Sequence, residues 1–137
     1  MTEPQTAIFI SAAFAGAGAP YLRRGFALDS LPVRATLRYT ALGLVEPWLN
    51  GGRVGDELLA PGWTSYTHRV IVSSEDVTDR LTLGENVLGA IVGNGWAAGR
   101  LGWDGKRNVY VDRPAALLSL ELAFADGSVD GVAIGAG

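Results

Sequence analysis

The 137-residue sequence contains no cysteine and a single histidine, His68. Without cysteine, the chain has neither a disulfide framework nor thiol chemistry. A zinc site or a catalytic triad normally recruits more than one histidine, so the sequence argues against both kinds of site. We therefore expect His68 to be a surface or packed histidine within a strand.

Positive charge is also sparse. The chain has 11 Lys and Arg against 14 Asp and Glu, which gives a net charge of −3 and a pI near 5.0. The basic residues are scattered, whereas nucleic acid binding would need a basic stripe, so we predict no nucleic acid partner. With 48% hydrophobic and 18% charged residues, 137 residues suit one folded domain with a full core.

Long hydrophobic runs are missing as well. The apolar stretch over residues 7–19 is interrupted by Ser11 and two glycines, and a transmembrane helix needs about 20 apolar residues. Glu3 precedes it and no basic residue does, so a signal peptide fits poorly. We predict no membrane partner. The compartment stays open, although the lack of a signal peptide and of cysteine favours the cytoplasm.

What the sequence does contain is a series of short alternating segments separated by turn residues. Such patterning is typical of half-buried antiparallel strands. We predict strands over residues 21–28, 33–42, 44–49, 66–76 and 86–95, a helical turn within 76–86, and a hairpin over 115–132. The fold class is therefore an all-β antiparallel β-sandwich or jelly roll. We place the domain at 19–132, an N-terminal arm or extra strand at 1–18 and a tail at 133–137.

Turn chemistry supports these boundaries. Asn50 followed by Gly51 is a strong hairpin signal, because both residues accept a positive φ. Asp126 followed by Gly127 marks the turn of the last hairpin. Pro47 lacks a backbone N–H, so it makes 44–49 an edge or bulged strand.

Tryptophan and polar residues gather in and beside the segment NGWAAGRLGW, residues 94–103. Indole rings stack on the apolar faces of sugars while Asn and Asp bind hydroxyls, so this mixture suits a small-ligand pocket. The candidate ligand-binding set is Asn94, Trp96, Trp103, Asp104, Asn108 and Asp112. The alternative is that the tryptophans pack within the domain or across an interface. We expect packing for Trp48 and Trp63, whereas Trp96 and Trp103 stay open.

No catalytic residue is predicted. Carboxylates are available for glycoside cleavage at Asp56, Glu57, Asp104 and Asp112, but such chemistry depends on a distance across a cleft. We expect these four side chains to be solvated loop acids. No nucleotide-binding motif is present, because no glycine group joins a strand to a long helix.

Three long stretches carry a family resemblance: TALGLVEPWLNGGRVGDELLAPGWTSYTHRV, DVTDRLTLGENVLGAIVGNGWAAGRLGW and RNVYVDRPAALLSLELAFADGS. They closely resemble the N-terminal β-sandwich domain of bacterial alpha-L-rhamnosidases, glycoside hydrolase family 78. The resemblance covers roughly residues 19–128. Ala97 and Ala98 stand where the family usually has an aromatic residue, which makes a tight stacking platform doubtful.

The resemblance implies a galactose-binding-domain-like sandwich whose catalytic acids lie in a separate (α/α)₆ barrel. That catalytic domain is the implied partner, and the chain alone is expected to be inactive. It would assist substrate recognition or brace the barrel. The alternative is a carbohydrate-binding module for L-rhamnose or rhamnosylated glycans. A related module uses calcium, so calcium is possible, although no cofactor is required and no metal ligand is assigned. A small independent enzyme is the third hypothesis.

Overall fold

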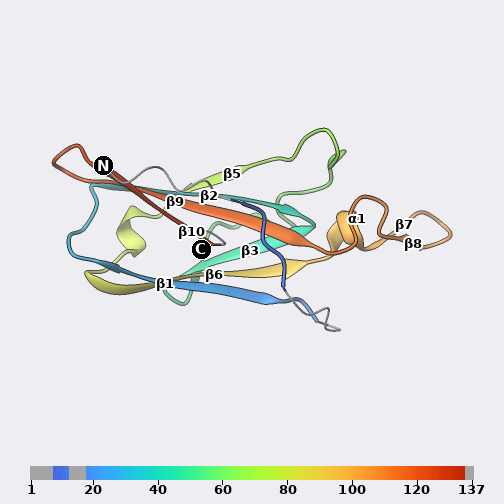
Figure 1. Ribbon diagram of the computed structural model, residues 1–137, viewed down its shortest axis with the longest axis horizontal. Helices are drawn as coiled ribbons and strands as arrows, with labels where there is room; N and C mark the ends of the chain where they lie inside the picture. Colours follow the sequence, from blue (N-terminus) through green and yellow to red (C-terminus); the bar gives the residue numbers. More distant parts are fainter. Residues whose placement is uncertain (1–7, 13–17, 135–137) are drawn as a thin grey trace.

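The computed structural model describes residues 8–12 and 18–134, and they form two four-stranded antiparallel sheets lying one over the other (Figure 1). In one sheet the strand order is β1 (Tyr21–Leu28), β6 (Gly84–Gly93), β3 (Leu44–Leu49) and β4 (Gly52–Arg53). In the other it is β10 (Val129–Ile134), β9 (Ala115–Ala123), β2 (Arg34–Leu42) and β5 (Ser73–Asp76). The predicted antiparallel β-sandwich is confirmed.

Three short elements complete the described chain. A two-stranded ribbon pairs β7 (Arg100–Leu101) with β8 (Lys106–Arg107) and projects from one end of the sandwich (Figure 1). The helices are single turns, η1 (Thr78–Arg80) and α1 (Gly95–Ala98), and η1 confirms the predicted helical turn. Among the described residues, no helix has the length and apolar character needed to cross a membrane.

Alternating side chains from both sheets build the core. On β9, Leu118, Leu120 and Leu122 are almost fully buried, as the alternation predicted. They meet Leu37 and Tyr39 of β2 and Leu88 of β6 within a single buried cluster. Burying a large aliphatic side chain contributes about 2 kcal/mol, so this cluster is a principal source of stability.

On the outer face of β2, Arg34 and Arg38 are exposed as the alternation predicted, whereas Thr36 and Thr40 are covered. Thr40 points away from the core yet is 2% exposed, and its hydroxyl donates to the Ile71 carbonyl at 2.6 Å. The segment that precedes β5 therefore lies against β2 at Thr40. Val33, predicted to point inward, stands before β2 and is 62% exposed.

The strand predicted for residues 66–76 is mostly wrong, because only Ser73–Asp76 pair. The preceding residues form a turn instead. The N–H groups of His68 and Arg69 both donate to the Ser65 carbonyl, and the Thr64 hydroxyl donates to the Arg69 carbonyl at 2.8 Å. Local hydrogen bonds of this kind compete with a ladder and explain the error.

The two chain ends differ from their predicted boundaries. The tail predicted from residue 133 is wrong in its first residues, because Ala133 and Ile134 belong to β10 and are 1% and 3% exposed. In the predicted N-terminal arm, Ile10 exchanges two backbone hydrogen bonds with Ala116. Residues 1–7, 13–17 and 135–137 lie outside the described residues.

The β3–β4 hairpin closes through the predicted two-residue turn. Asn50 has a φ of 50° and Gly51 a φ of 80°, the left-handed pair that a tight hairpin requires. Strand β3 pairs with β4 only at Trp48 and Leu49. Pro47 therefore lies where β4 does not pair, although β6 pairs along the other side of β3.

Two asparagine side chains join this hairpin to β6. Asn86 is 1% exposed; its Oδ1 accepts from Asn50 Nδ2 at 2.8 Å and from the Thr82 N–H at 3.0 Å. Its Nδ2 donates to the carbonyls of Thr82 and Gly84. Asn50 Oδ1 accepts from the Val87 N–H at 2.8 Å, so the two amides satisfy backbone groups of both segments.

We predict that Asn86→Ala lowers the free energy of unfolding by about 3 kcal/mol, because it leaves several buried polar groups without partners. Urea unfolding followed by circular dichroism measures the change. The control is Asn94→Ala, an exposed asparagine, which should shift the free energy by no more than about 0.5 kcal/mol. Equal losses in the two variants would contradict the role assigned to Asn86.

Candidate functional site

The six residues of the predicted ligand-binding set do not converge on one place. Three of them, Asn94, Asn108 and Asp112, line a single open cavity of about 390 Å³. Trp96 lies outside that lining, and Trp103 and Asp104 occupy the loop between β7 and β8. The sequence grouped these residues by chain proximity, and the fold separates them.

The cavity is formed where β6 ends and β9 begins. Two guanidinium side chains that the sequence did not single out as ligands, Arg107 and Arg113, join the three predicted residues in its lining. Arg113 Nε lies 3.9 Å from Asp112 Oδ2, and both side chains are largely exposed. Asn108 has a φ of 56°, a left-handed conformation that asparagine tolerates. A volume of about 390 Å³ lies within the range of small-molecule pockets.

Trp96 packs on another tryptophan. Its ring stacks on Trp63 with centroids 6.2 Å apart and planes 3° from parallel. In a second aromatic pair, Tyr66 and Tyr110 meet edge to face with ring centroids 5.1 Å apart. Trp63, for which we expected packing, uses one face in this way but remains 55% exposed.

Trp103 has the opposite environment. It lies in the loop Gly102–Gly105, whose two terminal glycines have φ values of 73° and 63°. Its exposure of 108% of the reference value means that neighbouring residues cover none of the indole. Asp104 beside it is also exposed. Within the described residues Trp103 therefore does not pack inside the domain, and packing across an interface stays open for it.

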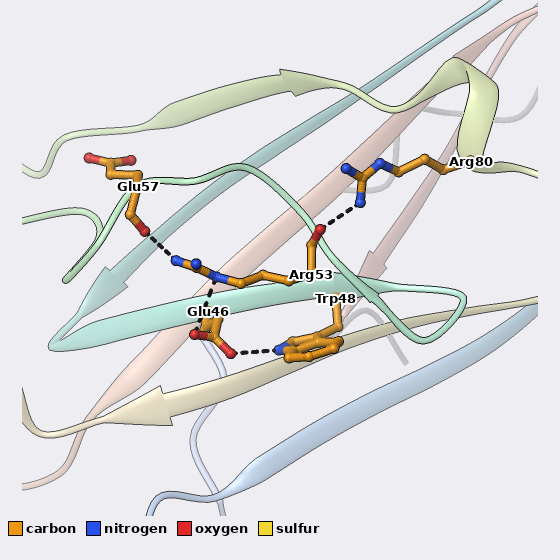
Figure 2. A network of polar contacts seen from close by, with 5 residues as sticks. All are labelled: Glu46, Trp48, Arg53, Glu57 and Arg80. Atoms are coloured by element: carbon orange, nitrogen blue, oxygen red, sulfur yellow. Dashed lines mark hydrogen bonds and ion pairs between the residues drawn. The ribbon is translucent and has the colours of Figure 1, made fainter.

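A second polar cluster joins the two strands of the β3–β4 hairpin (Figure 2). Glu46 Oε1 accepts from Trp48 Nε1 at 2.9 Å, and Glu46 Oε2 lies 3.3 Å from Arg53 Nε. Arg53 also donates to the Glu57 carbonyl, and Arg80 donates to the Arg53 carbonyl. Arg53 Nε is buried and has no hydrogen-bond partner among the described residues. Its positive charge is balanced by the ion pair with Glu46. Trp48 is half-buried here, in keeping with the packing expected of it.

Two described carboxylates serve local turns. Asp76 Oδ1 accepts from the backbone and hydroxyl of Thr78, and these bonds lower the pKa of Asp76. The Ser128 hydroxyl and N–H lower the pKa of Asp126 in the same way. Among residues 8–12 and 18–134, no three His, Asp or Glu side chains are close enough to hold a metal ion. His68 is exposed, with Ser65 and Thr67 hydroxyls near its Nδ1.

Two tyrosines have raised pKa values. Burial, followed by the nearby carboxylates of Glu57 and Glu75, raises the pKa of Tyr39. Burial and the neighbouring Tyr110 raise the pKa of Tyr66. Both phenols therefore hold their protons more tightly in the folded chain than in the unfolded one, where the pKa is about 10.

The raised tyrosine pKa values predict a loss of stability in alkali. Below about pH 10 both phenols are neutral in either state, so the contribution is fully present. As the pH rises above that value, the unfolded chain releases protons first and the free energy of unfolding falls. Urea unfolding at about pH 9 and about pH 11 measures the decrease. Tyr39→Phe should make it smaller, and an unchanged decrease would contradict the assignment.

The chain matches one family over most of its length. The alpha-L-rhamnosidase N-terminal domain family matches residues 31–136. An alpha-L-rhamnosidase of Streptomyces avermitilis is 47% identical over 115 residues, which are 83% of this chain and 11% of that protein. One from Formosa agariphila is 38% identical over 108 residues, 79% of this chain and 12% of that protein.

Solved structures agree with these matches. The crystal structure of the Streptomyces avermitilis alpha-L-rhamnosidase complexed with L-rhamnose aligns with 86% of this chain at 44% identity and a TM-score of 0.83. The native Aspergillus terreus enzyme aligns with 95% at 40% identity and the same TM-score. This chain covers only 12% and 15% of those two chains, so it spans a small part of such proteins.

Proposed function

This chain belongs to the alpha-L-rhamnosidase N-terminal domain family, and we propose that it is a non-catalytic accessory domain that packs against the rest of a longer rhamnosidase. By holding the catalytic domain in place, this domain would also assist substrate recognition. Its relatives are rhamnosidases of which this chain spans 11% to 12%. The catalytic domain of the same polypeptide is therefore the proposed partner.

The small share of its relatives that this chain spans is the observation that supports a non-catalytic role, and three carboxylates with local structural contacts agree with it. Glycoside cleavage normally needs a proton-donating carboxyl and a second carboxylate facing it across a cleft. A general acid has a raised pKa, whereas Asp76 and Asp126 have lowered ones and serve as turn acceptors. Glu46 is engaged by Trp48 and Arg53. None of these three is placed to donate a proton to a leaving group.

We predict that the isolated chain releases no nitrophenol from nitrophenyl alpha-L-rhamnoside. A chimera, in which this chain replaces the aligned segment of the Streptomyces avermitilis enzyme, should hydrolyse the same substrate. Deleting that segment should lower the unfolding temperature, because an interdomain contact is lost. Turnover by the isolated chain would contradict the non-catalytic role, and an unchanged unfolding temperature after deletion would contradict the bracing role.

A second candidate function is carbohydrate binding, and the cavity beside Asn94, Asn108 and Asp112 favours it. Amide groups and a carboxylate lining about 390 Å³ can hydrogen-bond the hydroxyls of one sugar. This donor set does not fit calcium, which takes six to eight oxygens and several carboxylates. Asp112 is the one carboxylate in the lining, and Arg107 and Arg113 accompany it.

If this second function holds, the isolated chain binds L-rhamnose, and Asn108→Gly weakens binding by about tenfold because one hydrogen bond is lost. Glycine keeps the left-handed backbone, so the change removes only the amide. Isothermal titration calorimetry with calcium and with a chelator measures the affinity. Trp96→Ala is the control and should leave it unchanged. Glucose binding of equal strength, or a loss caused by Trp96→Ala alone, would contradict this site.

A further inference from the structure

Exposed apolar side chains are concentrated at the α1 end of the sandwich. Two segments supply half of the large exposed hydrophobic residues in the described chain: the loop before β5 and the segment from α1 to β9. These residues are Leu58, Leu59, Trp63, Ile71, Val72, Trp103 and Val109. Figure 1 shows both segments extending beyond the strands at the same end. Single exposed apolar residues are ordinary, but such a gathering normally meets a partner.

Aromatic contacts join these two segments. The Trp63–Trp96 stack and the Tyr66–Tyr110 pair each connect the loop before β5 with the segment after β6. Tyr66 is 9% exposed, so its pair is anchored in the domain, whereas Trp63 is 55% exposed. The stack therefore presents an indole outward from a supported position. We call the exposed residues Leu58, Leu59, Trp63, Trp103 and Val109 of these two segments the docking end.

The β7–β8 ribbon gives the docking end a projecting anchor. Trp103 at its tip is 108% exposed, and burial of an indole on association is a strong driving force. Arg100, Lys106 and Arg107 on the ribbon outnumber Asp104, although the whole chain carries a net charge of −3. A surface that receives this ribbon is expected to combine an apolar pocket with acidic residues around it.

We propose that the docking end seats on the remainder of the rhamnosidase polypeptide, with Trp103 inserted into an apolar pocket bordered by acidic side chains. This inference rests on the proposed accessory role and adds the surface and the anchor. The length of the matched proteins supports this choice of partner. This chain covers only 12% and 15% of two matched rhamnosidase chains. Most of such a polypeptide lies outside the domain and is available to cover the docking end.

The opposite end of the sandwich provides a control position for testing the docking end. Strand β9 has nine residues, so about 26 Å separates its two ends. Exposed apolar residues at the far end, such as Leu31, are aliphatic, and no described aromatic pair supports them. Ser30 beside Leu31 is exposed and lies near the β9–β10 turn. A probe at Ser30 therefore reports on a surface that should stay free.

Cysteine labelling tests the proposal directly, because the chain has no cysteine of its own. Asp104→Cys places a thiol next to Trp103 and leaves the indole intact, and Ser30→Cys is the control. Maleimide labelling of each variant is measured by mass spectrometry in the isolated chain and in the chimera defined above. We expect labelling at position 104 to be at least tenfold slower in the chimera, and labelling at position 30 to be equal in both. Adding Trp103→Ser should restore the faster rate at position 104.

Each other outcome overturns the inference. Equal labelling at position 104 in both proteins, with protection at position 30, would show that the domain docks through its other end, and the accessory role would survive. Protection at neither position, with an unchanged unfolding temperature after segment deletion, would also refute the accessory role. Concentration-dependent protection of the isolated chain would identify a second copy as the occupant. Protection by L-rhamnose alone would identify a sugar.

Discussion

The hydrogen-bonded pair of amides at Asn50 and Asn86 is the constraint on which the sheet containing β3 and β6 depends. Each side-chain amide forms hydrogen bonds with backbone N–H and C=O groups of residues 80–87. Asn50 serves the tight turn after β3, and Asn86 serves the approach to β6. Their direct contact holds two segments 36 residues apart at a fixed spacing. Together with the two hydrogen bonds between Asn50 and Val87, this contact continues the β3–β6 register past the pairing of Leu49 with Leu88.

The two ends of the sandwich differ in how their connecting segments are built. Turns at the β9–β10 end are short and are closed by acids such as Asp126, whose oxygen accepts the next backbone and hydroxyl donors. At the α1 end, apart from the single residue Gly43 between β2 and β3, the connections are long, rich in aromatic residues and held together by ring contacts. Stability is secured by the strands and the short turns, which leaves the long connections available for recognition. The Glu46–Arg53 cluster lies on the strands and belongs to the stabilising part (Figure 2).

Local signals predicted the strands and turns, whereas the site depended on contacts that sequence spacing does not encode. Alternation located β9, and Asn50 followed by Gly51 located the hairpin, because both signals act over a few residues. Trp96 and Trp103 looked alike in sequence. They differ because Trp63, 33 positions before Trp96, covers one indole and no described residue covers the other. Arg107 and Arg113 reached the cavity through folding alone, and no local pattern identified them.

The outer strands of the two sheets have a consequence for how the domain meets other chains. At two of the sheet edges stand β4 with two residues and β5 with four, and Pro47 has no N–H to offer beyond β4. Strand addition requires a row of free backbone donors and acceptors, and such short edges supply few. The edge strand β1 carries the exposed Arg23, whose charge opposes close pairing with a foreign strand, and Arg24, which donates to the Ala133 carbonyl of β10 in the other sheet. The domain can therefore sit within a large multidomain polypeptide without its sheets fusing with those of its neighbours.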